Sequence, residues 1–241
     1  MTTNRGRCPP APPAGFKSAL DTSAMDAEKE PWVRLFWNDQ DPLEFKISPR
    51  GNRFDPLGSP WEKTRVLYAG TSLETAIAET VLRWHSMLVP GKRVTVSEAG
   101  QLRDRRVARF KPIRKLNLID ATGLGMSAVE KAVTEVIALP EHTQWQTPPK
   151  PVADDIFQCH ADEYLQTQEW GGWFRSQHPD ADGLTWVSRQ FNMSQCLVLF
   201  EDRCGKDLRL IGKPVPLSKV GSSERQVLDH MFQRLGWGIE P

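Results

Sequence analysis

Apolar and aromatic residues gather in short runs that predict β-strands in several parts of the chain. The clearest runs cover residues 31–37, 65–70 and 196–200, and turn-forming residues bound each of them. Further short strands are expected at residues 93–96, 107–110, 115–119, 184–187 and 208–211. Because these strands do not alternate regularly with helices, the pattern predicts a mixed α+β fold, with mostly antiparallel sheets and a few flanking helices.

The strongest helical pattern follows the strand at 65–70. Thr71 and Glu74 form a capping box that predicts a helix over residues 71–88. One apolar stripe runs along this helix at helical spacing, through Ile77, Val81, Trp84 and Leu88.

Three further helices are expected. One begins at a second capping box, Ser127 and Glu130, and another runs from Asp154 or Asp155 to the glycine pair at 171–172. The last covers residues 222–235 and is closed by a glycine.

These elements suggest how the chain is organised. Residues 1–30 are rich in proline and lack an apolar pattern, which predicts a flexible N-terminal arm. Residues 31–205 are expected to form the main domain, and residues 206–241 a strand and helix extension packed on it. The segment 38–60 reads as a long irregular connection, and its aromatic residues favour a functional loop.

Composition excludes several classes of protein. The 241 residues carry 31 Lys and Arg against 30 Asp and Glu, so a protein that grips nucleic acid mainly through its phosphates is not expected. No window has 18 uncharged apolar residues, and the N-terminus lacks the apolar core of a signal peptide. Four widely spaced cysteines are expected to be free buried thiols. These features indicate a cytoplasmic protein without a membrane anchor.

Common catalytic signatures are missing from the sequence. There is no glycine-rich nucleotide fingerprint, no H-E-x-x-H motif and no G-x-S-x-G motif. The five histidines form no ligand pair, so we expect no metal site.

A few polar residues occupy unusual positions. Glu79 lies across its helix from the apolar stripe, so it either faces solvent or lines a cleft against a second wall. Arg53 sits in a loop with Gly and Pro, where a guanidinium could capture phosphate or could be plain surface. Arg34 interrupts an aromatic strand and must reach solvent or an anion, and Ser188 ends a strand.

Together these residues belong to four motifs that occur in a characteristic order. They are Trp-Val-Arg34-Leu-Phe, Asn-Arg53-Phe-Asp-Pro-Leu-Gly, Leu-Tyr68-Ala-Gly-Thr-Ser-Leu-Glu-Thr-Ala-Ile-Ala-Glu79, and Asp182-Gly-Leu-Thr-Trp-Val-Ser188. This succession resembles the RES domain over about residues 31–203. The family commonly has Gly where this chain has Asn52, and often Tyr where it has Trp186.

The resemblance implies a fold similar to that of ADP-ribosyltransferase toxins and a role as the toxin of a bacterial toxin–antitoxin pair. Family members bind NAD+ and break its nicotinamide–ribose bond by phosphorolysis or hydrolysis. Carried over to this chain, Arg34 and Arg53 would hold phosphates and Tyr68 would pack beside nicotinamide. Glu79 would serve the scissile ribose, and Ser188 would hydrogen-bond the ligand. Glu79, Arg53 and Ser188 are the expected catalytic residues.

The resemblance also implies partners. NAD+ would be the substrate, inorganic phosphate a co-substrate, and no other cofactor is expected. The protein partner would be an Xre-like helix-turn-helix antitoxin, with no direct binding of nucleic acid or membrane; a homodimer stays open.

Two alternative functions stay open. One is transfer of ADP-ribose to a protein or nucleic acid, but such enzymes commonly carry an acidic residue two positions before the catalytic Glu, where this chain has Ile77. The other is a non-catalytic binding module.

Overall fold

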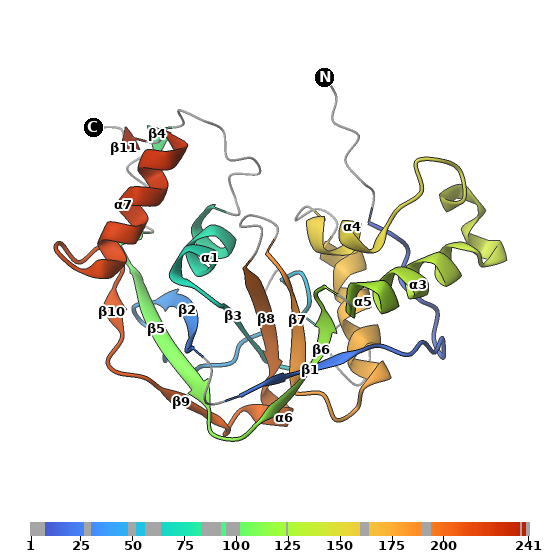
Figure 1. Cartoon of the computed structure of the whole chain (residues 1–241), viewed down its shortest axis with the longest axis horizontal. Coiled ribbons are helices and arrows are strands. Elements are labelled where there is room, and N and C mark those ends of the chain that lie inside the picture. Colours follow the sequence, from blue (N-terminus) through green and yellow to red (C-terminus); the bar gives the residue numbers. More distant parts are fainter. Residues whose placement is uncertain are drawn as a thin grey trace.

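The computed structural model describes residues 8–26, 30–47, 52–55, 64–82, 93–94, 102–123, 125–159, 164–188, 194–236 and 238–239. Within these segments, nine strands form one sheet in the order β1-β6-β7-β8-β3-β2-β5-β10, with β9 also paired to β5 (Figure 1). Neighbouring strands run antiparallel except β6 and β7, which are parallel. The strands are β1 (Thr22–Met25), β2 (Trp32–Trp37), β3 (Val66–Gly70), β5 (Arg105–Pro112), β6 (Leu116–Ala121), β7 (Gly183–Val187), β8 (Gln195–Phe200), β9 (Leu208–Leu210) and β10 (Val215–Pro216).

Helices flank the two halves of this sheet. Figure 1 shows α3, α4 and α5 beside the half that contains β6 to β8, and α1 and α7 beside β2 and β5. The helices are α1 (Leu73–Ile77), the π-helix η2 (Ala78–Leu82), α3 (Gly125–Ile137), the 3₁₀-helix η3 (Pro140–Trp145), α4 (Ala153–Gln158), α5 (Tyr164–Gln177), α6 (Glu201–Cys204) and α7 (Ser223–Leu235). A separate parallel pair is formed by β4 (Arg93–Val94) and β11 (Gly238–Ile239). The predicted mixed α+β fold with a mostly antiparallel sheet is therefore confirmed.

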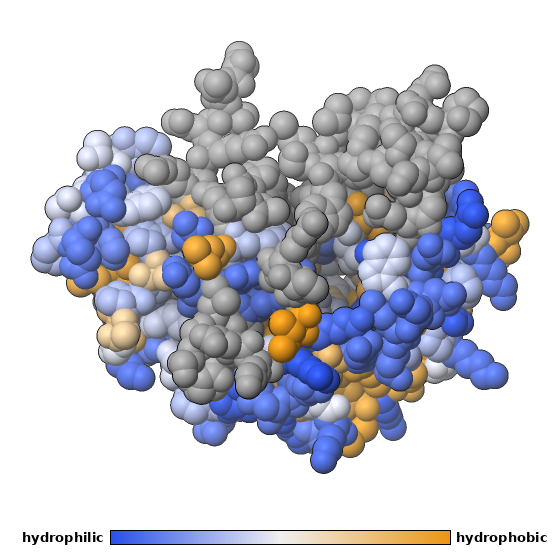
Figure 2. Space-filling model, turned by 180° about the vertical axis from the view of Figure 1, so that it is seen from behind, coloured by the Kyte–Doolittle hydropathy of each residue, from blue (hydrophilic) through white to orange (hydrophobic). Residues whose placement is uncertain are grey.

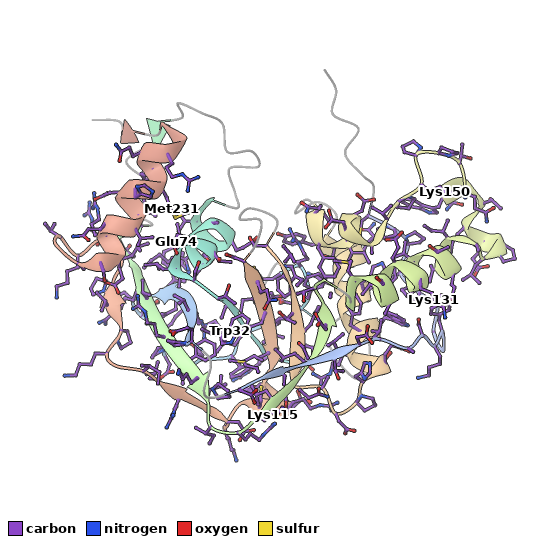
Figure 3. The ribbon with its side chains drawn as sticks, viewed as in Figure 1. Trp32, Glu74, Lys115, Lys131, Lys150 and Met231 are labelled. Carbon is purple, nitrogen blue, oxygen red and sulfur yellow. The ribbon has the colours of Figure 1, made fainter. Side chains whose placement is uncertain are left out.

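Three apolar clusters hold these layers together. The first joins β6, β7 and β8 to α3, α4 and α5, with Val133 and Phe174 fully buried in it. The second joins β2 and β5 to α1 and α7, and it includes Ile77 of α1 and Met231 of α7, which Figure 3 labels. Since successive side chains of a strand alternate between its two faces, the same sheet also supplies the third cluster, which includes Trp32.

The N-terminal residues differ from the flexible arm predicted for residues 1–30. β1 pairs along its whole length with β6, and Cys8 is buried. The indole N–H of Trp170 donates to the carbonyl oxygen of Pro9 at 3.1 Å. Residues 8–26 thus gain partners that lie far away in sequence, which local composition does not indicate. Residues 1–7 and 27–29 lie outside the described residues.

The helix predicted over residues 71–88 begins at Leu73, with its N-cap one residue later than predicted, and it changes type. Ser72 is its N-cap rather than Thr71, because the Ser72 hydroxyl oxygen accepts from the backbone N–H of Thr75 at 3.1 Å. After α1 the chain widens into the π-helix η2. The predicted residues 83–88 lie outside the described residues.

Other helix boundaries depend on packing. α3 begins at Gly125, ahead of the predicted capping box, and the helix predicted to end at residues 171–172 continues as α5 to Gln177. A Cβ on Gly171 would lie 3.1 Å from the carbonyl oxygen of Phe54, so this glycine permits close packing on the loop 52–55. The predicted closing glycine of α7 is confirmed, since Gly236 has a left-handed φ of 63°.

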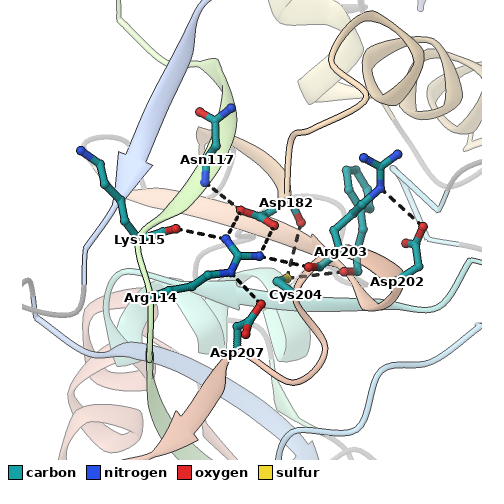
Figure 4. A network of polar contacts seen from close by, with 9 residues as sticks. Arg114, Lys115, Asn117, Asp182, Asp202, Arg203, Cys204 and Asp207 are labelled. Carbon is teal, nitrogen blue, oxygen red and sulfur yellow. Dashed lines mark hydrogen bonds and ion pairs between the residues drawn. The ribbon is translucent and has the colours of Figure 1, made fainter.

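A polar network fastens the starts of β6, β7 and β9 (Figure 4). The Arg114 guanidinium donates to both carboxylate oxygens of Asp182, at 2.8 and 2.9 Å, and its Nε donates to Asp207 at 2.8 Å. The backbone N–H of Asn117 also donates to Asp182, at 2.9 Å. These bonds, those with Asp182 above all, raise the pKa of Arg114 further above neutrality. The network positions β7, and Ser188 follows the last residue of that strand.

The described surface is mostly hydrophilic on the face that Figure 2 shows, and its hydrophobic residues form small separate groups. None of the helices in the described segments is long and apolar enough to cross a membrane.

Candidate active site

The sheet opens into a fork between β2 and β3. β2 pairs with β5 over six residues and β3 pairs with β8 over five, but β2 and β3 share a single register pair, Val33 with Gly70. A cavity of about 550 Å³ is lined by β2, β3, α1 and η2. Arg34, Arg53, Tyr68 and Glu79, which the sequence singled out, all line it.

Arg34 is anchored by the chain segment that follows β2. Its Nη1 donates to the carbonyl oxygens of Pro42 and Glu44, at 3.2 and 2.7 Å. Burial lowers the pKa of Arg34 to about 10, although the carboxylates of Glu44 and Asp41 oppose this shift. The guanidinium therefore stays charged at neutral pH and supplies a fixed positive charge to the cavity wall.

Arg53 is anchored on the opposite side, at the end of α4. Its guanidinium is buried and donates to the carbonyl oxygens of Phe157 and Cys159. Its carbon Cζ lies 5.9 Å from the centroid of the Tyr164 ring. Its Nε is buried and has no hydrogen-bond partner among the described residues. A buried cationic donor of this kind suits an anionic ligand.

Tyr68 fastens the loop that carries Arg53. The Tyr68 hydroxyl donates to the Asp55 carboxylate at 2.9 Å and accepts from the backbone N–H of Phe54 at 3.0 Å. The Tyr68 ring meets the Trp186 ring edge to face, with centroids 6.3 Å apart. These contacts hold the loop 52–55 against the sheet and fix the orientation of the Tyr68 ring.

Glu79 comes from the π-helix η2 and is half-buried. Isolated π-turns are frequent at functional sites, because the wider turn redirects side chains. The hydroxyl of Ser188, at the end of β7, donates to Oε1 of Glu79 at 2.6 Å, the length of a charge-assisted hydrogen bond. The family resemblance assigned Ser188 to the ligand, and that role stays a prediction; in the structure the Ser188 hydroxyl donates to the carboxylate of Glu79.

Cys196 is a cavity residue that the sequence indicated only as a buried thiol. It lies on β8 opposite Trp186, and all four cysteines are buried and form no disulfide, as predicted. Burial raises the pKa of the Cys196 thiol well above its usual value, as does the charge of Glu79; Ser188 and Arg53 oppose the shift. The thiol is therefore neutral beside Glu79.

The cavity carries an excess of positive charge. The described side chains that line it include the cations of Arg34, Lys46, Arg53 and Arg105, against the single carboxylate of Glu79. Lys46 also contacts Glu44, with Nζ and Oε2 3.3 Å apart. Such a cavity favours an anionic ligand with several phosphate oxygens.

Trp37, Gln40, Lys46 and Arg105 line the cavity but were missed by sequence reasoning. Trp37 carried only the signal of a strand aromatic, and Arg105 reaches the cavity only because β5 pairs with β2. Among the described residues, no group of three or more His, Cys, Asp or Glu side chains is arranged to hold a metal ion.

A curled, mostly antiparallel sheet with a cationic cavity in its fork is consistent with the ADP-ribosyltransferase-like fold. The RES domain model matches residues 31–218, so the chain belongs to the RES domain family. Among solved structures, it is similar to a chain of the crystal structure of the M. tuberculosis MbcT-MbcA toxin–antitoxin complex, with 15% sequence identity and a TM-score of 0.50. The match covers 86% of this chain and 91% of that chain. No curated protein matches the sequence.

Proposed function

We propose that this protein is the toxin of a bacterial toxin–antitoxin pair, and that it degrades NAD+ by cleaving the bond between nicotinamide and ribose. The observation that carries the proposal is the convergence of Arg34, Arg53, Tyr68 and Glu79 on one cationic cavity, with Ser188 bonded to Glu79. Membership in the RES domain family and the similarity to a chain from a toxin–antitoxin complex support it.

Glu79 is the group that acts on the ribose. When the nicotinamide–ribose bond breaks, positive charge develops on the ribose ring, and a nearby carboxylate stabilises that charge. The hydrogen bond from Ser188 holds the carboxylate in one orientation before the reaction, so that no reorganisation is needed. Nicotinamide leaves as a neutral molecule, because its ring nitrogen already carries positive charge and takes both electrons of the bond.

Arg34 and Arg53 bind the pyrophosphate of NAD+. Both guanidiniums are fixed by backbone carbonyls on opposite sides of the cavity, so they hold the dinucleotide across the fork. In phosphorolysis an oxygen of inorganic phosphate forms the new bond to the ribose carbon, which gives nicotinamide and a phosphorylated ADP-ribose. In hydrolysis water takes that place and loses a proton. We favour phosphorolysis, because the excess of cations suits a second anion.

Transfer of ADP-ribose to a macromolecule is the second candidate activity. Enzymes of that kind commonly use an acidic residue two positions before the catalytic Glu. Here that position is Ile77, which is fully buried in the cluster between α1 and α7. The burial of Ile77 therefore disfavours transfer of ADP-ribose. Transfer would be supported if labelled NAD+ left its label on an added protein or nucleic acid.

The proposed partner is an Xre-like helix-turn-helix antitoxin that blocks the cavity, and the proposed location is the cytoplasm, where NAD+ is available. Adding the purified product of a neighbouring DNA-binding reading frame should stop nicotinamide release. Unchanged release in the presence of a stable complex would contradict this arrangement.

The direct test is nicotinamide release from NAD+ by the purified protein, with and without inorganic phosphate. Release that requires phosphate and yields phosphorylated ADP-ribose supports phosphorolysis, and release without phosphate supports hydrolysis. No release under either condition overturns the proposed activity and favours a binding module.

Glu79→Gln should lower the turnover number by about 100- to 1000-fold, because the amide keeps the hydrogen bond with Ser188 but carries no charge. The matched control is Glu74→Gln on the neighbouring turn of α1 (Figure 3), since Glu74 does not line the cavity. Full activity of the Glu79→Gln variant would remove this carboxylate from the mechanism.

A further inference from the structure

A second group of residues lines the cavity near the C-terminal end of β2, and the proposed reaction does not use them. Phe36, Trp37, Gln40 and Arg105 line the same cavity. Trp37 lies four residues after Val33, the point where β2 meets β3, which is about 13 Å along an extended strand. This end of the cavity is therefore far enough from the β2–β3 junction to contact a different part of an extended ligand.

Trp37 and Arg105 form a layered pair at this end. They are direct cross-strand neighbours on β2 and β5. The guanidinium carbon of Arg105 lies 3.5 Å from the centroid of the Trp37 ring, the spacing of stacked planes. The backbone N–H of Trp37 also donates to Oε1 of Gln40 at 3.4 Å, which holds the turn after β2 against the strand.

Accessible aromatic surface distinguishes two places in the cavity. Phe36, Tyr164 and Trp186 are buried, whereas Trp37 and Tyr68 are half-buried and keep part of their surface accessible. Tyr68 comes from β3 and the half of the site that holds Arg53 and Glu79, and Trp37 from the far end of β2. A ligand with a flat ring at each end and phosphates between them matches this distribution.

We propose that Trp37 and Arg105 form the platform on which the adenine base of NAD+ stacks, an inference that rests on the proposed function. Stacking on an aromatic ring and on a guanidinium plane are both common ways to bind a base. The adenine ring stacks on the Trp37–Arg105 pair as a third parallel plane. Arg34 and Arg53 hold the pyrophosphate. The nicotinamide ring lies beside Tyr68. Trp37 and Arg105 are positioning residues, because neither reaches the bond that breaks.

The test compares NAD+ with nicotinamide mononucleotide, which keeps the scissile bond but lacks the adenosine half. Trp37→Ala should lower kcat/KM for NAD+ by about 5- to 150-fold, mainly through KM. The same variant should leave kcat/KM for nicotinamide mononucleotide within about twofold of wild type. Trp37→Phe, which keeps an aromatic face, should restore most of the activity on NAD+.

Arg106→Ala is the matched control for Arg105→Ala. Arg106 is the next residue on β5, but its guanidinium donates to the Pro214 carbonyl and to Asn38 and does not line the cavity. We expect Arg105→Ala to raise KM for NAD+ and Arg106→Ala to leave it unchanged. Melting temperatures of all variants check that each one folds.

The affinity for ADP-ribose, measured by calorimetry, gives a readout that does not require turnover. Trp37→Ala should raise this dissociation constant by the same factor as KM for NAD+. Two results would contradict the proposed adenine platform. One is an equal fall in kcat/KM for NAD+ and for nicotinamide mononucleotide. The other is an unchanged dissociation constant for ADP-ribose in a folded Trp37→Ala variant. Failure of the wild-type protein to consume NAD+ would instead overturn the proposed function.

Discussion

Several side chains that line the cavity are also hydrogen-bonded to the surrounding protein. Arg34 and Arg53 each donate to two backbone carbonyls. Tyr68 bonds both Asp55 and the backbone of Phe54. Such bonds restrict each side chain to one rotamer before a ligand arrives, which lowers the entropy lost on binding. Trp186 is different: its indole N–H is buried on the cavity wall without a hydrogen-bond partner among the described residues.

This difference predicts how two tryptophan substitutions change stability. Trp186→Phe and Trp170→Phe remove similar volume, but Trp170 donates to the Pro9 carbonyl at 3.1 Å. Trp170→Phe leaves that carbonyl without its donor, whereas Trp186→Phe removes an unpaired donor. The free energy of unfolding, measured with urea, should therefore fall by roughly 1–3 kcal/mol more for Trp170→Phe. An equal or larger fall in the free energy of unfolding for Trp186→Phe would contradict the view that the Trp186 indole N–H has no hydrogen-bond partner among the described residues.

At the scale of elements, a few charged contacts attach helices and strand ends to the sheet. Arg114 and Asp182 join the starts of β6 and β7. A second contact attaches α7 to β5: Nη1 of Arg109 on β5 donates to the carboxylate of Glu224 in the first turn of α7, at 2.8 Å. Glu224 is buried, which by itself raises its pKa, but hydrogen bonds from its own backbone N–H and from Arg109 outweigh this and lower the pKa.

The lowered pKa of Glu224 predicts an acid-dependent attachment of α7. Its contribution to stability is complete above the unfolded pKa of about 4.3 and is lost as the pH falls through the lower folded value. Glu224→Gln should therefore cost about 1–2 kcal/mol of unfolding free energy at pH 7, and the difference from wild type should disappear in acid. Urea titrations at several pH values measure this.

Glu135→Gln is the control for this prediction. Glu135 forms an exposed pair with Lys131 on α3, with Nζ and Oε1 3.9 Å apart, so its loss should change the unfolding free energy by less than about 0.5 kcal/mol. A difference between Glu224→Gln and wild type that persists below pH 3 would show that the carboxylate charge is not responsible.

For the whole molecule, the fork between β2 and β3 divides one sheet into two halves. One half carries Arg53, Tyr68 and Ser188 with the cluster around α3, α4 and α5, and the other carries Arg34 and Trp37 with α7 packed nearby. A dinucleotide in the cavity would contact both halves, so binding should couple them.

Hydrogen exchange tests this coupling. Saturating ADP-ribose should slow the exchange of backbone amides in both β2 and β3, since a ligand that binds the folded state reduces local opening around its site. β1, at the far edge of the sheet, should change little and serves as an internal reference. Slower exchange in only one of the two strands would contradict a ligand that spans the fork.

Local patterns were sufficient to predict most elements. The runs at 196–200 and 222–235 correspond closely to β8 and α7, because their own side chains supply the apolar face and the capping residues. β1 was missed, since its one sheet neighbour among the described strands is β6, almost a hundred residues later. The glycine pair of α5 was misread for the same reason, because Gly171 packs on Phe54.

For the candidate site as well, some features could be predicted from the sequence and others depend on the tertiary structure. The sequence by itself singled out Arg34, Arg53 and Glu79 as side chains that could bind phosphates or stabilise a positive charge, and it placed them on a strand, in a loop and on a helix. Only the tertiary structure decided that they share one cavity, that Ser188 bonds Glu79, and that Trp37 lies against Arg105. The physical reason is that side-chain chemistry and local periodicity belong to neighbouring residues, whereas strand register and the opening between β2 and β3 arise from contacts between distant parts of the chain.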